Sequence, residues 1–104
     1  MHLRSLIGAI LSLTVLSAAA ASTPQDALDA MRRGDFAAAY PIWNELANAG
    51  DDRAAIEVGL MHHIGRGRPV SYDDAYTWYL KAFPKNGDAW NNIGVMYRDA
   101  LGKV

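Results

Sequence analysis

Residues 59–70, which read GLMHHIGRGRPV, contain the side chains in this sequence that most resemble a chemical site. His62 and His63 are adjacent, and Arg66 and Arg68 then alternate with glycines. Histidine is a common zinc ligand, and glycine-rich turns with basic residues can hold phosphate. The residue types therefore suggest three kinds of site, namely a metal site, a phosphate loop or a nucleic-acid patch.

The spacing supports none of them. His62 and His63 point about 100° apart on a helix, whereas a zinc site on one helix face needs the i, i+4 spacing of H-E-x-x-H. A phosphate loop needs the longer Walker spacing and a Lys-Ser or Lys-Thr, which this stretch lacks. Asp73 and Asp74 are adjacent in the first turn of a predicted helix, where acids favour the helix dipole rather than converging in a cleft. We therefore predict no catalytic residue, no metal ligand and no cofactor.

Composition narrows the class of protein further. The chain has 104 residues, and ten Lys and Arg stand against eleven Asp and Glu. A formal net charge of −1 provides no general attraction to nucleic acid. The absence of cysteine excludes disulfides, thiolate catalysis and cysteine-based zinc sites. The length predicts a single domain.

Residues 1–21 have the pattern of a secretory signal peptide. Arg4 precedes an apolar run over residues 6–16, and an alanine-rich tail ending at Ala21 offers cleavage sites. The run is too short to span a bilayer comfortably as a mature helix. We therefore expect export to the periplasm or secretion, with no stable membrane insertion after cleavage, and a mature domain over residues 22–104.

The mature chain reads as a series of helices, which predicts an all-α fold. The helical segments cover about residues 22–34, 35–50, 51–65, 71–83 and 87–102. Ser, Thr or Asp begins each segment, with Asp88 as the expected cap of the last, and glycine or proline follows each end. Pro41 lies inside the second segment and predicts either a kink or a helix that begins near it. No segment of the mature chain alternates like a strand.

The sequence repeats itself at a shift of 35 or 36 residues. Several glycine and aromatic positions coincide in two copies, over about residues 35–70 and 71–104. The aligned pairs include Gly59 with Gly94, His62 with Tyr97, Tyr40 with Tyr76 and Trp43 with Tyr79. The histidine stretch is therefore the end of a helix and the turn after it, in a repeating helical hairpin.

The repeat explains the glycines and aromatics as structural residues. Gly65 and Gly67 are expected to stop a helix and to form a tight turn. Gly59 and Gly94 lie within helices, where each costs about 1 kcal/mol relative to Ala, so we expect close packing against a neighbouring helix there. The tryptophans, Trp43, Trp78 and Trp90, are spaced as core residues.

The stretches SYDDAYTWYLKA and AWNNIGVMYRDALGKV resemble the pattern DYxxAxxWYxKA followed by AxxNLGxMYxxGxGV. This is the pattern of the Sel-one-like repeat family, a branch of the tetratricopeptide-repeat superfamily. DFAAAYPIWNELANAG and AAIEVGLMHHIGRGRPV form a weaker second copy, so the resemblance covers residues 35–104. It implies an α-solenoid of antiparallel helix pairs, with about two and a half hairpins, in an exported bacterial member.

The resemblance also implies a function. Family members are mostly non-catalytic scaffolds that bind proteins on a concave face, so we expect a protein–protein interaction module of the bacterial envelope and not an enzyme. One alternative is a protein that binds or hydrolyses cell-wall or β-lactam compounds, although the members linked to this activity are disulfide-rich. Another is a truncated repeat fragment without an independent role. An unpaired last helix would also permit self-association.

The first helix of each pair lines the concave face in this superfamily. Counted from the helical glycines, the resemblance places eight partner-binding residues there, which are Arg53, Ile56, Leu60, His63, Asp88, Asn91, Val95 and Arg98. Their mixture of charged, amide and apolar side chains suits a protein or peptide partner rather than nucleic acid.

Overall fold

The computed structural model describes residues 22–102, and this part of the chain contains helices and turns but no strand. The helices are α2 (Pro24–Arg32), α3 (Phe36–Asn48), α4 (Asp52–Ile64), α5 (Tyr72–Ala82) and α6 (Asp88–Leu101). The all-α prediction is confirmed. The predicted signal peptide, residues 1–21, and the last two residues lie outside the described part.

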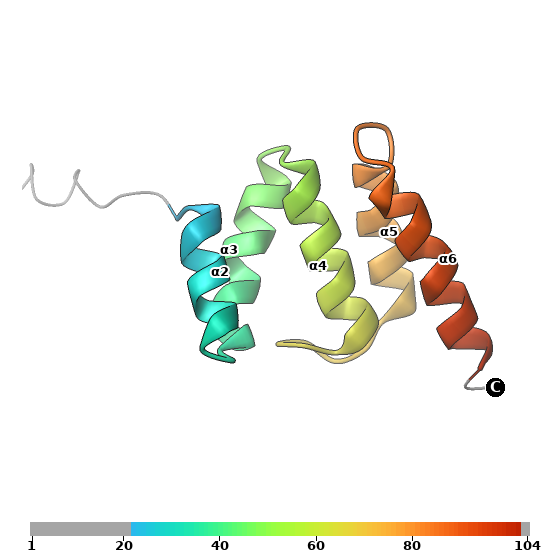
Figure 1. The fold of residues 1–104 in the computed structure, drawn as a ribbon, viewed down its shortest axis with the longest axis horizontal. Coiled ribbons are helices and arrows are strands. Elements are labelled where there is room, and N and C mark those ends of the chain that lie inside the picture. The colour runs from blue at the N-terminus through green and yellow to red at the C-terminus, as the bar shows by residue number, and fades with distance from the viewer. Residues whose placement is uncertain (1–21, 103–104) are drawn as a thin grey trace, which may run out of the picture.

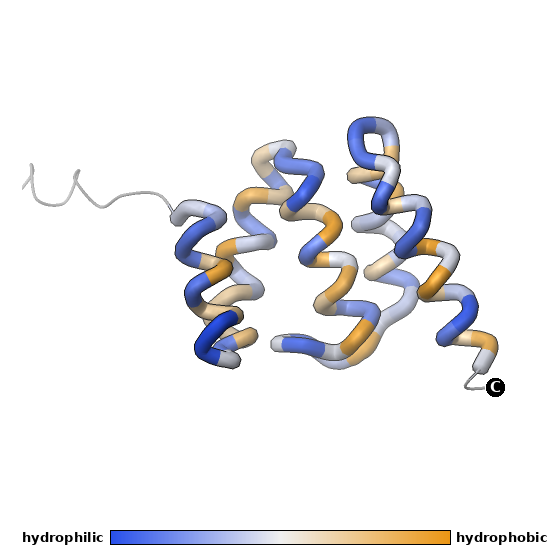
Figure 2. The backbone as a smooth tube through the Cα atoms, viewed as in Figure 1, coloured by the Kyte–Doolittle hydropathy of each residue, from blue (hydrophilic) through white to orange (hydrophobic). Residues whose placement is uncertain are grey.

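Consecutive helices lie side by side. Each helix packs against the next one along the chain, and α4 also contacts α6. Figure 1 shows this order, with α2 at one side of the molecule, α6 at the other and short connections between neighbours. Figure 2 shows hydrophobic and hydrophilic residues interleaved along the helices, as expected for helices that bury one face.

Side-chain caps fix where most of the helices begin. The Thr23 hydroxyl accepts a hydrogen bond from the Asp26 N–H at 3.3 Å, and the Asp26 carboxylate accepts one from the Thr23 N–H at 2.9 Å. This reciprocal capping box satisfies two N–H groups that have no partner within the helix. Asp35, Asp51 and Ser71 cap the helices that follow them in the same way, with one bond each.

The prediction that Asp88 caps α6 is wrong. Asp88 is already the first residue of the helix, and Gly87 precedes it without a side-chain cap. The side-chain oxygen of Asn86 accepts a hydrogen bond from the Asp88 N–H at 3.1 Å. Asn86, in the turn before the helix, therefore takes the role that the sequence assigned to Asp88.

Pro41 does not delay the start of α3. The helix begins at Phe36 and continues through Pro41 to Asn48. Proline removes the hydrogen bond that residue 41 would donate to the carbonyl of Ala37. Both residues are exposed, so water can reach that carbonyl and replace the lost bond.

The buried residues form two hydrophobic clusters that share α4. The first cluster joins α4 to α2 and α3, and it includes Ala54 and Val58. The second joins α4 to α5 and α6, and it includes Ala55 and Ile56. Helix α4 is therefore apolar on opposite sides, which is the pattern of a helix that lies inside a layer of helices.

A close contact holds α5 against α4 at Gly59. A Cβ atom placed on Gly59 would lie 2.5 Å from Cε1 of Tyr79, well inside van der Waals contact. The Tyr79 side chain is fully buried, so its ring cannot simply move aside into solvent. The predicted close packing is confirmed at Gly59.

The same prediction is wrong at Gly94. Apart from the adjoining backbone of α6 itself, no atom lies within 4 Å of a Cβ placed there. Trp90, one turn earlier on α6, is 62% exposed and is not the core residue that its spacing predicted, whereas Trp43 is 1% exposed. The open space at Gly94 and the exposure of Trp90 have the same cause, which is that no helix of the described part covers this face of α6.

We predict opposite effects of the same substitution at the two glycines. Gly59→Ala should lower the free energy of unfolding by about 1–3 kcal/mol, because overpacking against Tyr79 outweighs the better helix propensity of alanine. Gly94→Ala should raise it by about 0.5–1 kcal/mol, because only the propensity term applies. Urea unfolding followed by circular dichroism measures both. Equal effects of the two substitutions would contradict this account.

Candidate functional site

A polar groove lies between the N-terminal halves of α4 and α6. Its volume is about 510 Å³, and its lining consists of one arginine, two carboxylates, three asparagines and an isoleucine. These residues are Arg53, Ile56, Glu57, Asn86, Asp88, Asn91 and Asn92. The groove therefore brings together four of the eight predicted partner-binding residues, namely Arg53, Ile56, Asp88 and Asn91.

The other predicted residues lie farther along the two helices. Leu60 is half-buried against the second hydrophobic cluster, and Val95 is half-buried on α6. Arg98 is exposed. His63 is only 6% exposed, and its ring nitrogens bond within the chain. Of these four, Arg98 alone presents a freely accessible side chain.

The sequence did not single out Glu57, Asn86 and Asn92 as groove residues. Glu57 follows Arg53 by one helical turn and shares its face of α4. Burial raises the pKa of the Glu57 carboxyl, and the positive charge of Arg53 opposes part of that rise. Helical periodicity could have found Glu57, but Asn86 lies in the turn before α6, whose path periodicity does not determine.

His63 connects three helices from within the core. Its Nε2 lies 2.7 Å from the Asp99 carboxylate of α6, and its Nδ1 lies 3.3 Å from the Tyr79 hydroxyl of α5. A carboxylate only accepts hydrogen bonds, so Nε2 carries the proton, and in the neutral ring Nδ1 accepts from Tyr79. Burial, and then the charge of Glu57, raise the pKa of the Tyr79 hydroxyl, which keeps it a neutral donor.

This Asp–His–Tyr series resembles a proton relay in its order of residues, but of its three side chains only the Asp99 carboxylate is exposed. The Tyr79 side chain is fully buried, and His63 is almost so. A general acid or base has to come within hydrogen-bond reach of the reacting group. The series therefore positions α5 and α6 on α4.

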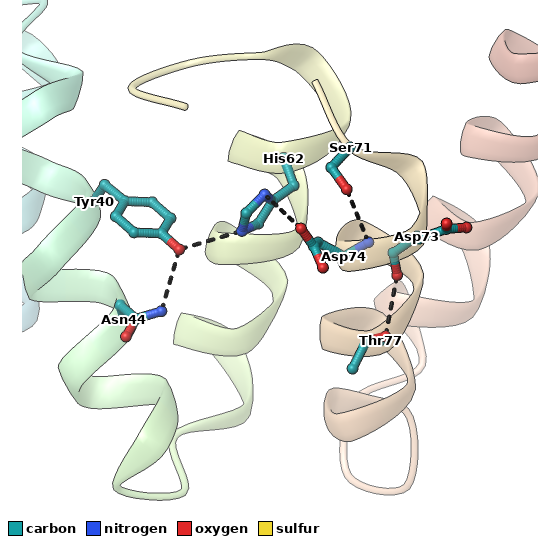
Figure 3. A network of polar contacts seen from close by, with 7 residues as sticks. All are labelled: Tyr40, Asn44, His62, Ser71, Asp73, Asp74 and Thr77. Carbon is teal, nitrogen blue, oxygen red and sulfur yellow. Dashed lines mark hydrogen bonds and ion pairs between the residues drawn. The ribbon is translucent and has the colours of Figure 1, made fainter. Parts of the chain in front are cut away.

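His62 forms a second network, between α3 and α5 (Figure 3). Its Nε2 lies 3.2 Å from the Tyr40 hydroxyl, which also accepts a bond from the Asn44 amide at 3.4 Å. Its Nδ1 lies 3.9 Å from the Asp74 carboxylate. The network joins α3, α4 and α5.

His62 packs in the position that the alignment assigned to an aromatic residue. Its ring meets the Tyr40 ring edge-on, with centroids 5.6 Å apart. The aligned residues, Tyr76 and Tyr97, make the corresponding edge-on contact with centroids 6.0 Å apart. His62 therefore acts as a buried aromatic residue with two polar atoms.

The arginines of the 65–71 turn pack on aromatic rings of α3. Arg66 lies over Phe36, 5.0 Å from the ring centroid, and Arg68 lies over Tyr40 at 4.7 Å. Gly67 has a positive φ, and a Cβ there would lie 2.6 Å from the Phe36 carbonyl oxygen. The glycine and the arginines thus hold the turn against α3. The alternation of glycine and arginine over residues 65–68 therefore serves cation–π packing on α3.

Residues 22–102 hold neither a metal-binding cluster nor a membrane span. In this range no three His, Asp or Glu side chains come together in a group that could hold a metal ion. No helix of the same range is both long and apolar enough to cross a bilayer.

Comparison with known proteins adds no family assignment. No protein-family model matches the chain, and no curated protein matches it. The resemblance to Sel-one-like repeats therefore remains a prediction that rests on the residues quoted above.

We predict that His62 makes stability depend on pH. Burial, with a smaller effect of Arg68, lowers the pKa of His62 below its ordinary value of 6.5, and Asp74 opposes this shift. The unfolded chain then binds a proton more readily than the folded chain, so the stabilisation is complete above pH 6.5 and is lost as pH falls towards the folded pKa.

The measurement is the free energy of unfolding of the wild type and of His62→Gln between about pH 7.5 and pH 5. Glutamine offers Tyr40 a polar partner but does not titrate in this range. The difference between the two proteins should shrink as pH falls, by at most about 1.4 kcal/mol per pH unit. Parallel pH curves would contradict the prediction.

Proposed function

We propose that this chain is a non-catalytic module that binds another protein through the groove between α4 and α6. The observation that carries the proposal is the set of seven residues that line this groove. The groove has both charges and amides along its walls, and Ile56 supplies an apolar contact within it. This composition suits a polypeptide better than it suits a purely ionic or purely apolar ligand.

The asparagines are the most informative residues of the groove. Each asparagine side chain can donate and accept hydrogen bonds at once, as a peptide main chain does. Asn86, Asn91 and Asn92 can therefore bond an extended segment without requiring particular side chains in it. Arg53 and Asp88 add charges of opposite sign, which can select the partner's charged residues.

The Asp–His–Tyr series is accounted for as a link between helices. Its tyrosine is buried, and the bonds of His63 join helices rather than face the groove. No feature of the described part favours action on cell-wall or β-lactam compounds over protein binding. We therefore place the cell-wall alternative, and that of a fragment without a role, behind a protein-binding scaffold.

The fold and location form part of the same proposal. We infer an α-solenoid of Sel-one-like type, and the packing of each helix on the next one supports this inference. The corresponding contacts of Tyr40 with His62 and of Tyr76 with Tyr97 support it as well. The pattern of residues 1–21 supports export to the envelope of a bacterium, as a periplasmic or secreted protein.

We predict that a photo-crosslinking amino acid at Asn91 captures a partner in living cells. The same amino acid at Thr77, which is exposed on α5 and does not line the groove, is the matched control. A discrete heavier band should form from position 91 and not from position 77.

Adding Arg53→Glu to the Asn91 crosslinking variant should weaken the band by about tenfold, equivalent to about 1.4 kcal/mol, because it reverses a charge in the groove wall. Equal bands from both positions, or an Asn91 band unaffected by Arg53→Glu, would place the binding surface elsewhere.

A further inference from the structure

The outer face of α6 is apolar and uncovered in the described part of the chain. Trp90, Tyr97 and Leu101 are 62%, 52% and 73% exposed. With Gly94 they follow each other at intervals of four, three and four residues, which places them on one face of the helix. Phe83 extends this surface, because its ring centroid lies 5.4 Å from that of Trp90.

The helix at the opposite end of the row has a different character. The exposed residues of α2 are proline and polar side chains, which are Pro24, Gln25, Asp26 and Arg32. Two side-chain bonds cross this surface, from Gln25 to Asp29 at 2.8 Å and between Arg32 and Asp29 at 3.0 Å. The α6 face therefore has no apolar counterpart on α2, and head-to-tail stacking of copies would bury polar groups against aromatic ones.

We propose that α6 pairs with α6 of a second copy of this chain, in an antiparallel, two-fold symmetric contact centred on Gly94. Gly94 has open space on its Cβ side, so two helix backbones can approach closely there. The aligned Gly59 already accommodates a neighbouring element in this way, because the Tyr79 side chain packs directly on the backbone of α4 there. The same patch on both copies satisfies the self-complementarity of a two-fold contact.

Arg98 determines the direction of the pairing. In a parallel pair, Arg98 of each copy would lie next to Arg98 of the partner subunit, and the two charges would repel. In an antiparallel pair centred on Gly94, residues 90 and 98 are equally far from the centre, so Arg98 faces Trp90 of the partner subunit. A guanidinium over an exposed indole ring is a favourable cation–π contact.

The interface is small, so the dimer should be weak. Each copy contributes one 14-residue helix and the Phe83 side chain. A stable complex typically buries about 800 Å² on each partner, and a contact of this size lies at the lower end. We expect a dissociation constant on the order of 10–100 µM.

The first test is sedimentation equilibrium over about 5–500 µM protein, a range that brackets this constant. It is applied to the full chain and to a chain that begins at Ser22, which retains both hydrophobic clusters. Both should dimerise with the same constant. If only the full chain associates, residues 1–21 carry the association and the proposal is overturned. If both remain monomeric at the highest concentration, the proposal is also overturned.

The variant Gly94→Glu separates loss of pairing from loss of folding. Two glutamates would meet at the two-fold axis, and the dissociation constant should rise by about tenfold or more. Within one copy the new side chain has open space and stands one turn before Arg98, so the thermal midpoint should not fall. The control Ala37→Glu adds the same charge at an exposed position in the first turn of α3 and should leave dimerisation unchanged. Unchanged dimerisation in Gly94→Glu would overturn the proposal.

The absence of cysteine allows a direct test of the register. Under mild oxidation, Gly94→Cys should form a disulfide-linked dimer, because the two sites meet at the axis. Leu101→Cys should not, because in the antiparallel pair its two copies are separated by about 21 Å along the helices, beyond the reach of a disulfide. Equal crosslinking at both positions would indicate a parallel pair and would contradict the proposal.

Discussion

The packing of the Tyr79 ring on the backbone of α4 at Gly59 is the contact on which the rest of the structure depends. Any side chain at position 59 would separate α5 from α4. Because the ring lies so close, its hydroxyl reaches His63, and the other nitrogen of His63 reaches Asp99 on α6. One missing side chain therefore fixes three helices relative to one another, and the bond to Asp99 joins the C-terminal ends of α4 and α6.

The two histidines show why adjacent residues of one helix can belong to different parts of the core. Helix α4 lies between two hydrophobic clusters, so His62 turns towards α3 and His63 towards α5 and α6. Each ring brings buried polar atoms that require partners, and tyrosine hydroxyls supply one on each side. The pair that looked like a metal site is thus a polar link between two apolar layers.

Local features were predictable because they depend on a few neighbouring residues. Thr23 and Ser71 begin helices, and Gly65 ends one, by bonds and dihedral angles within a single turn. The groove was predictable only in part, because Arg53 and Asn91 follow the helical period whereas Asn86 depends on a turn. The burial of His63 and the exposure of Trp90 could not be read locally. Both depend on which neighbouring helix is present. The repeat aligns α4 with α6, but α4 has neighbours on both sides, whereas the face of α6 that carries Trp90 is exposed in the described residues.

Helices α4 and α6 are not consecutive but are in contact, and this affects how easily α6 can open locally. Within residues 22–102, helix α6 is covered on one side only, so its backbone hydrogen bonds should open with a lower free energy than those of α4. A ligand in the groove touches both helices and binds only when α6 is in place. Occupancy of the groove and closure of α6 are therefore thermodynamically linked, and each favours the other by the same free energy.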